Sequence, residues 1–302
     1  MTSAAPPRTT EFVDPRYRDI DAWPPATALA ALLEAQLAAA AAVQAALPAI
    51  AAAAAAAAAR LEAGGRLVYA GAGTSGRLAV QDAAELVPTF GWPAARLVLL
   101  PAGGAAALLH AVEGAEDDDA AAHTMVAEHA LGAADVAIGV AASGNTAFTC
   151  AVLAAAAARG AVTIGIANSP GTRLLALAAH PILADTGAEP IAGSTRLKAG
   201  TAQKIVLNLL STLLMLRLGH VYRGLMVDMV VGNAKLHARA RAMLHTLTGA
   251  EDAAAAGALA AAGGNVKTAV LLLRGLDIAA ARALLARHRG RLRAALGELA
   301  GG

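Results

Sequence analysis

Cysteine and aromatic residues are scarce in this chain of 302 residues. Cys150 is the single cysteine, which excludes a disulfide within the chain and a metal site built from several cysteines. The eight histidines show no ligand spacing such as His-x-x-x-His, so we expect no metal. Aromatic residues make up 3% of the chain, and the net charge of +2 comes from dispersed Lys and Arg residues. Neither nucleic acid nor an acidic membrane is therefore indicated as a partner.

A secretory signal is also missing, because no charged segment precedes an apolar run in the first residues, and we expect a cytoplasmic protein. One uncharged stretch, Ala35–Ala59, is long enough to be considered as a membrane span. Alanine contributes little to membrane insertion, Gln36 and Gln44 are polar, and Pro48 interrupts the run. We therefore expect a soluble helical pair that bends near Pro48, preceded by an extended arm over residues 10–25.

The central feature of the chain is an expected strand, loop and helix over residues 67–85. An apolar segment leads into the loop Gly71-Ala-Gly-Thr-Ser-Gly-Arg77, and a helix-like pattern follows. Glycine lets the backbone approach a ligand closely, and the free N–H groups of a helix N-terminus favour an anion. Because Thr74 and Ser75 add hydroxyl donors, the expected ligand is a phosphate.

The same loop also has the Gly-x-Gly-x-x-Gly spacing of a dinucleotide site. That kind of site requires an acidic residue about 20 positions further on, at the end of the next strand. Residues 96–101 (RLVLLP) form the next expected strand and contain no acid. A nucleotide P-loop is not favoured either, because no Gly-Lys-Ser/Thr follows the glycines.

A second copy of the arrangement strengthens the phosphate interpretation. Residues 135–146 again run from a strand-like segment into a turn that carries Ser143 and Thr146, and a helical pattern follows over residues 147–159. One such turn alone would be an ordinary capped connection. Two turns at the carboxyl ends of parallel strands favour a shared ligand. A third helix start contains Ser194 and Lys198, and an anionic partner is expected there because cations are disfavoured at that position.

Two groups of carboxylates are candidates for chemistry. Glu85 is expected near the end of the helix, before Pro88, where the helix dipole disfavours an acid, although a solvated helix-end glutamate is the alternative. Five acids lie between Glu113 and Asp119, and such a run is usually a solvated loop or the first turn of a helix. That interpretation still allows one of these carboxylates to face a ligand.

The chain divides by pattern into three parts. Residues 1–59 are expected to form the arm and the first helices, residues 60–250 an α/β domain with a further strand at 160–168, and residues 251–302 a small module. Three short helices are expected in this module, separated at Gly263-Gly264, at 275–277 and near Gly290. Its basic end is interpreted as a solvated face, because no aromatic residues lie between the arginines.

Several motifs, in this order, resemble those of N-acetylmuramic acid 6-phosphate etherases. They are residues 71–77 (GAGTSGR), Asp82 with Glu85, 88–90 (PTF), 112–118 (VEGAEDD), 141–144 (AASG), 193–198 (GSTRLK), 200–204 (GTAQK), 225–228 (LMVD) and 233–236 (NAKL). The resemblance covers roughly residues 60–245, and residues 264–270 also resemble that family. The arm departs from the family form, an Asn-Pro-x-Ser/Thr followed by Ile-Asp, because this chain has Asp14-Pro-Arg-Tyr-Arg-Asp-Ile-Asp21.

The resemblance implies an α/β fold of the sugar-isomerase (SIS) type, with a five-stranded parallel sheet, a three-helix C-terminal module and a homodimeric state. It also implies a lyase, without cofactor, that converts the D-lactyl ether of N-acetylmuramic acid 6-phosphate to N-acetylglucosamine 6-phosphate and D-lactate in cell-wall sugar recycling. The family's catalytic glutamates fall on Glu85, assigned here as the general acid, and Glu116, assigned as the C2 base. The binding candidates are Gly73, Thr74, Ser75, Ser143, Gly144, Asn145, Thr146, Ser194 and Lys198.

Two other functions are compatible with these residues. An aldose–ketose isomerase on the same fold would also use a glutamate base but would release no lactate. A non-catalytic sugar-phosphate sensor would leave both glutamates idle, and the presence of Glu85 and Glu116 disfavours it.

Overall fold

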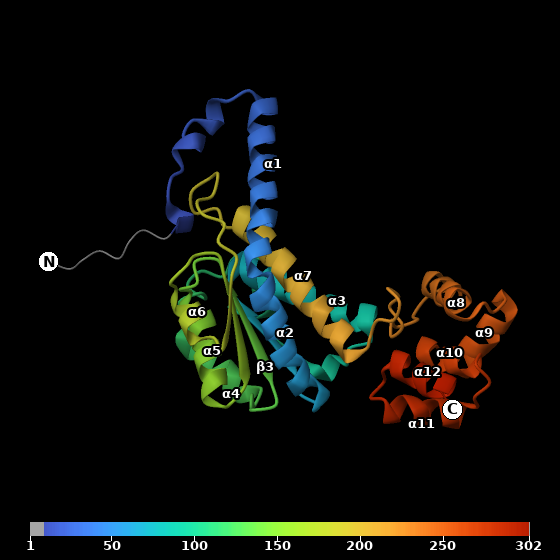
Figure 1. The fold of residues 1–302 in the computed structure, drawn as a ribbon. Helices are drawn as coiled ribbons and strands as arrows, with labels where there is room; N and C mark the ends of the chain where they lie inside the picture. Colours follow the sequence, from blue (N-terminus) through green and yellow to red (C-terminus); the bar gives the residue numbers. More distant parts are fainter. Residues whose placement is uncertain (1–8, 302) are drawn as a thin grey trace. The chain divides into compact units, whose positions relative to one another are not determined.

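The computed structural model describes residues 9–301 and contains a five-stranded sheet (Figure 1). All strands run parallel, in the spatial order β2-β1-β3-β4-β5. Their bounds are Leu67–Gly71 for β1, Leu97–Pro101 for β2, Val136–Ala141 for β3, Val162–Ala167 for β4 and His180–Leu183 for β5. Because β1 lies between β2 and β3, the strand order reverses at the β1–β3 pair. Ligands of open parallel sheets bind at such a switch point, outside the carboxyl ends of the strands.

The strand predictions from the sequence are confirmed for β1 to β4, with small differences at their ends. The sequence pattern did not single out β5, which has only four residues and includes Pro181. Proline has no N–H to donate to a sheet ladder and is tolerated at an edge, which is where β5 lies. The short edge strand therefore lacks the long apolar run by which the other strands were recognised.

Helices cover both faces of the sheet. The helices of the first part of the chain are α1 (Pro25–Ala42), α2 (Leu47–Glu62), α3 (Gly73–Phe90), α4 (Asp119–Glu128), α5 (Ala147–Ala158), α6 (Arg173–Leu177) and α7 (Lys198–Leu218). Figure 1 shows α4, α5 and α6 on one face of the sheet and α2 on the other. The residues of β1 and β3 are buried throughout, so the core lies around the two strands that form the switch point.

The expected helical pair is present as α1 and α2. The short 3-10 helix η4 (Val43–Ala46) joins them, and Pro48 lies in the first turn of α2, where a missing N–H costs no helical hydrogen bond. By length and composition alone, the segment Pro25–Glu62 and helix α7 could each cross a membrane. In the structure, α2 buries Ile50 and several alanines and contacts β3, β4 and β5, so its apolar face has a protein partner.

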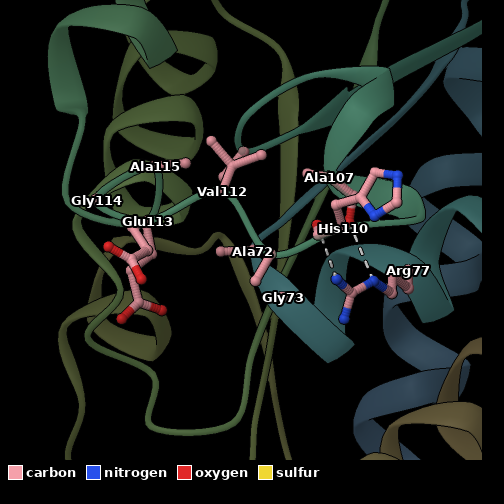
Figure 2. Close-up of a pocket in the computed structure, with 12 residues that line it drawn as sticks. Ala72, Gly73, Arg77, Ala107, His110, Val112, Glu113, Gly114 and Ala115 are labelled. Carbon is pink, nitrogen blue, oxygen red and sulfur yellow. Dashed lines mark hydrogen bonds between the residues drawn. The ribbon is translucent and has the colours of Figure 1, made fainter.

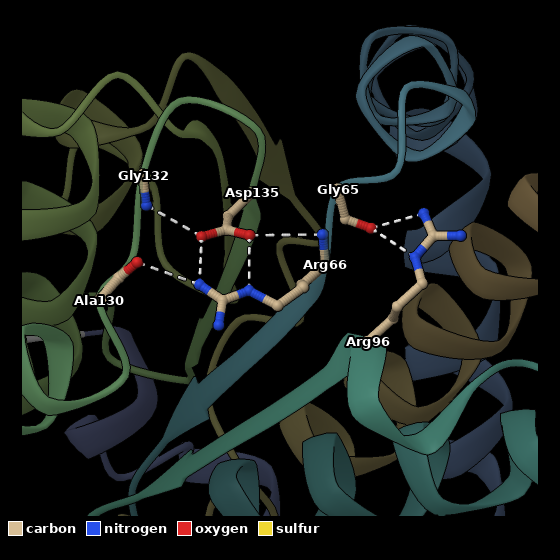
Figure 3. Close-up of polar contacts among 6 residues, drawn as sticks. All are labelled: Gly65, Arg66, Arg96, Ala130, Gly132 and Asp135. Atoms are coloured by element: carbon tan, nitrogen blue, oxygen red, sulfur yellow. Dashed lines mark hydrogen bonds and ion pairs between the residues drawn. The ribbon is translucent and has the colours of Figure 1, made fainter.

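An ion pair joins the beginnings of the two central strands (Figure 3). Arg66 precedes β1 and Asp135 precedes β3, and the guanidinium Nε and Nη2 donate to the two carboxylate oxygens over 2.9 and 2.8 Å. The main-chain N–H of Gly132 donates to the same carboxylate over 2.9 Å. Nearby, Arg96 donates from Nε to the carbonyl oxygen of Gly65 over 2.9 Å. These bonds fix the amino ends of the strands whose carboxyl ends carry the two hydroxyl turns.

The chain divides into two compact units. The first contains residues up to 83 and residues 95–211, and the second contains residues 84–94 and 212–302. Helices α8 (Ala234–Thr248), α9 (Asp252–Ala261), α10 (Val266–Leu272), α11 (Ile278–Arg287) and α12 (Leu292–Gly301) belong to the second unit.

The prediction of three helices after residue 250 is wrong, because the segment forms four. The three predicted breaks are present, but three breaks separate four helices, α9 to α12. Asn265 and Asp277 cap the second and third of these helices by accepting hydrogen bonds from main-chain N–H groups. The helices share a core with α8, formed by residues such as Leu244, Leu259 and Val270.

Candidate functional site

A polar cavity of about 270 Å³ lies at the switch point, within the first unit. It is bordered by the first residues of α3 and by the turn before α5, so two helix N-termini reach the same space. Such termini present free N–H groups and a positive dipole end to an anion. The lining residues are Glu11, Ala72, Gly73, Thr74, Ser75, Glu116, Asp117, Ala142, Ser143, Asn145, Thr146, Gly193 and Thr195.

Small residues make the two turns possible. A Cβ at Gly76 would lie 2.5 Å from the carbonyl oxygen of Gly71, so only glycine allows α3 to begin this close to the end of β1. Gly144 has a φ of +62°, and a Cβ there would meet the Thr172 hydroxyl at 2.2 Å. Gly144 thus shapes the second turn without lining the cavity.

The hydroxyl and amide groups of the second turn are arranged around its backbone. The Ser143 hydroxyl oxygen accepts a hydrogen bond from the Asn145 N–H over 3.3 Å, and the Asn145 side chain accepts one from the Arg173 N–H over 3.1 Å. Thr146 is the N-cap residue of α5, but its side chain makes no capping hydrogen bond. Its hydroxyl, which lines the cavity, can therefore donate to a bound anion.

Glu116 reaches the cavity from the acidic run. Its carbonyl oxygen accepts a hydrogen bond from the Phe148 N–H over 3.0 Å, which ties this residue to the first turn of α5. Asp118 instead caps α4 by accepting from the Ala121 N–H over 2.8 Å, and Asp119 lies in the first turn of that helix. The run thus combines the expected helix start with one carboxylate, Glu116, beside the phosphate candidates, and Asp117 borders the same cavity.

The N-terminus of α7 is occupied by a carboxylate of the same chain, Glu189. Glu189 is completely buried, and its carboxylate accepts hydrogen bonds from the N–H groups of Lys198 and Ala199, each over 2.9 Å. Burial raises the pKa of Glu189, and the two N–H bonds oppose that rise. The Lys198 ammonium donates to the carbonyl oxygen of Ala188. The anion that the sequence suggested for this helix start is therefore matched by a side chain of the protein itself, and neither Ser194 nor Lys198 lines the cavity.

Glu85 lies on α3 and has an exposed side chain. It follows Gly73 by twelve residues, which corresponds to about 18 Å along the helix axis at 1.5 Å per residue. The expectation that proline ends this helix is wrong, because α3 continues through Pro88 to Phe90. Gly91, with a φ of +63°, follows the last helical residue, as is common at helix ends.

Asp82, on the same helix, is buried in a polar network. It accepts hydrogen bonds from Asn208 over 2.6 Å, from Ser211 over 3.2 Å and from the Tyr69 hydroxyl over 3.4 Å. Burial raises the pKa of Asp82, and the hydrogen bonds from Asn208 and Ser211 act in the opposite direction. The network joins α3 to α7 and β1, so Asp82 has a structural role at this position of the motif.

The N-terminal arm contributes a carboxylate that the sequence interpretation missed. The carbonyl oxygen of Thr10 accepts a hydrogen bond from the Gly193 N–H over 2.8 Å, and the next residue, Glu11, lines the polar cavity. The arm forms three short 3-10 turns, Thr9–Glu11, Pro15–Tyr17 and Ile20–Ala22. A pattern of short polar segments carries no sequence signal for such a long-range contact.

A second cavity, of about 370 Å³, shares Ala72, Gly73 and Glu116 with the polar cavity. Figure 2 shows Arg77 and His110 on one side of it and Glu113 on the other. Arg77 donates from Nε to the carbonyl oxygens of Ala107 and Leu108, over 3.1 and 3.2 Å, and from Nη2 to that of His110 over 3.2 Å. The guanidinium thus holds the loop after β2 against α3.

Two family models match parts of the chain. Residues 49–157 match the glucokinase regulatory protein N-terminal SIS domain, and residues 112–213 match the SIS domain. A phosphoheptose isomerase from Francisella tularensis is similar in structure, with a TM-score of 0.49 and 19% identity over 64% of this chain and 100% of that chain.

Curated relatives are more similar. The N-acetylmuramic acid 6-phosphate etherase of Deinococcus radiodurans is 53% identical over 97% of this chain and 96% of its own length. The protein of that name from Streptomyces avermitilis is 49% identical over 78% of this chain and 76% of its own length. The resemblance found in the sequence motifs is confirmed, and this chain belongs to the N-acetylmuramic acid 6-phosphate etherase family.

Proposed function

We propose that this protein cleaves the D-lactyl ether of N-acetylmuramic acid 6-phosphate, giving N-acetylglucosamine 6-phosphate and D-lactate in the recycling of cell-wall sugars. Family membership supports the reaction. The structural observation that carries the proposal is the polar cavity in which Glu116 lies beside Ser75, Ser143 and Thr146 at two helix N-termini. This arrangement offers an anion site with carboxylates at its border, and we propose that Glu116 is the carboxylate that acts on the sugar, as an elimination on a sugar phosphate requires.

The chemistry uses the open-chain form of the sugar. The C1 aldehyde acidifies the proton on C2, and the Glu116 carboxylate removes that proton as a general base. The electron pair forms the C2–C3 double bond while the C3–oxygen bond breaks, and a general acid protonates the departing lactate oxygen. Water then adds its hydroxyl to C3 and a proton returns to C2, so the sum of the steps is hydrolysis of the ether.

The hydroxyl turns would hold the phosphate away from the bond that breaks. Ser75, Ser143, Asn145 and Thr146, together with N–H groups near Gly73, can form charge-assisted hydrogen bonds to its oxygens. Binding energy at such a remote group positions C2 against the base and thereby contributes to rate.

We propose Glu85 as the general acid, supplied by a second copy of the chain. About 18 Å of helix axis separate Glu85 from Gly73, which borders the cavity, within one α3. Because C2 and C3 of the sugar are adjacent atoms, the acid and the base must lie close together, which favours Glu85 from the second copy.

A homodimer is also supported by an apolar stripe on α1, where Leu29, Leu33 and Leu37 are 67%, 61% and 63% exposed at a spacing of four residues. We propose the cytoplasm as the compartment of the reaction, and the charged phosphate, which does not cross lipid readily, would keep the substrate in the compartment in which it is made.

The test is release of D-lactate from N-acetylmuramic acid 6-phosphate, measured for the wild type, Glu116→Gln and the surface control Glu128→Gln. We expect Glu116→Gln to lower kcat by about two to four orders of magnitude, as loss of a general base does, and Glu128→Gln to act like the wild type. Undiminished kcat in Glu116→Gln would exclude this residue as the base. Conversion of a sugar phosphate without lactate release would favour the alternative of an aldose–ketose isomerase. Binding of the sugar phosphate without turnover would favour the alternative of a non-catalytic sensor.

Shared sites can be tested by mixing inactive variants. Subunits carrying Glu85→Gln and subunits carrying Glu116→Gln would form hybrid dimers in which one site has both glutamates. We expect mixing to restore activity to a substantial fraction of the wild-type value. No recovery in dimers shown to have exchanged subunits would place both groups in one chain or exclude Glu85.

A further inference from the structure

The cavity in Figure 2 has basic and acidic residues on opposite sides. Its floor and walls are small apolar groups, the side chains of Ala72, Ala102, Ala107, Val112 and Ala115. On one side lie Arg77 and His110, and on the other lies Glu113, with Glu116 also bordering the space. A ligand group in this cavity would therefore meet cationic or donor groups at one end and carboxylates at the other.

Arg77 lines the cavity without an acidic side chain as its partner. Its three side-chain hydrogen bonds go to main-chain carbonyl oxygens, which are neutral, and none of the ion pairs within residues 9–301 includes it. It also lies in the second turn of α3, where the nearby helix N-terminus favours negative charge. The guanidinium and the helix N-terminus both favour an anion at this end of the cavity.

The substrate carries a second anion, the lactyl carboxylate, on the ether oxygen attached to C3. If the phosphate occupies the polar cavity and C2 lies beside Glu116, as proposed, the 3-O-lactyl group on the neighbouring carbon lies close to Glu116 as well. Glu116 and Gly73 border both cavities, so the adjoining space is the one within reach. The lactyl methyl group suits the alanine walls, and the lactyl carboxylate would be repelled by Glu113 and attracted by Arg77.

We propose that this second cavity is the lactyl subsite and that Arg77 and His110 bind the lactyl carboxylate. The assignment rests on the proposed function, because it names where one part of that substrate lies. It gives His110 a binding role, as a ring N–H donor, and it gives Arg77 two roles, support of the loop at residues 107–110 and recognition of the anion. Selectivity for an acidic ether over a neutral one then originates here.

The experiment compares two substrates, the natural ether and a synthetic analogue in which a neutral carboxamide replaces the lactyl carboxylate. His110 is the better residue to change because its side chain is exposed, whereas Arg77 supports a loop. We expect His110→Ala to lower kcat/KM for the natural ether about tenfold, the usual effect of losing a hydrogen bond to a charged group, and to leave the amide nearly unchanged. His110→Lys should retain the preference for the acid, and His123→Ala, on the exposed surface of α4, should change neither substrate.

A binding measurement separates this inference from the reaction itself. Titration of both ligands into the Glu116→Gln protein reports affinity without turnover, and adding His110→Ala to it should weaken the preference for the acid about tenfold, because Arg77 remains. Equal losses for acid and amide, in turnover or in binding, would overturn the subsite. Absence of D-lactate release by the wild type would instead overturn the proposed function, and the titration would still report whether this cavity selects a carboxylate.

Discussion

Replacement of Asp135 by asparagine tests the account of how the two central strands are held together. The Asp135 side chain is 4% exposed and receives hydrogen bonds from Arg66 and from the Gly132 N–H. The asparagine side chain would have the same size, but its NH2 group would face donors in place of one carboxylate oxygen. The partly buried Gly132 N–H or the Arg66 guanidinium would then lose its acceptor.

The expected cost follows from the burial of the two partners. Removing one partner of a fully buried ion pair costs about 3–5 kcal/mol. Arg66 is 30% exposed, so water can solvate its charge in the variant, and we expect a loss of about 2 kcal/mol in the free energy of unfolding. For a domain of this size the melting temperature should fall by about 4–8 °C. Differential scanning calorimetry at neutral pH measures this fall in melting temperature, and the surface substitution Glu128→Gln is the control.

The same variant makes a prediction about pH. Burial raises the pKa of Asp135, but the hydrogen bonds and charge of Arg66 and the Gly132 N–H outweigh it, so the pKa lies below its ordinary value. A lowered pKa in the folded state means that the stabilisation is present above the unfolded value and is lost as pH falls through the folded value. The difference between wild type and Asp135→Asn should therefore be constant near neutral pH and shrink in acid. Equal stability at neutral pH, or a difference that grows in acid, would refute the reasoning.

Three further changes test other parts of the molecule. Ser75→Ala should raise KM about tenfold and change kcat less, because it removes a hydrogen bond to the phosphate, which lies away from the bond that breaks. A large fall in kcat with an unchanged KM, measured by steady-state kinetics, would contradict a phosphate-binding role for Ser75. Glu189→Ala should lower the free energy of unfolding by about 2–4 kcal/mol, since two buried N–H groups at the start of α7 lose their acceptor, and an unchanged urea midpoint would argue against it. Leu33→Glu should convert the dimer to folded monomers in sedimentation experiments, because Leu33 is 61% exposed in the single chain, and a persisting dimer would place the interface elsewhere.

The parts of the site that were predicted from the sequence depend on local chemistry. Each hydroxyl turn follows its own strand and precedes its own helix within about ten residues, so glycine, serine and threonine at these positions were informative. Local patterns failed where the outcome depended on the surroundings. Helix α3 continues through Pro88, and β5 is a short edge strand that only its pairing with β4 defines. The proposed domain boundaries and the catalytic roles stay predictions.

The sequence by itself determined the strands β1 to β4, the two hydroxyl-bearing turns and the family, because these depend on periodicity, turn residues and motifs that are contiguous in the chain. Only the tertiary structure decided which groups meet. The pairing of β1 with β3 brings together turns that are about 70 residues apart, Glu189 reaches across a loop to the start of α7, and the arm delivers Glu11 to the cavity. The physical reason is that burial and hydrogen bonding act between neighbours in space, and no local pattern records those neighbours.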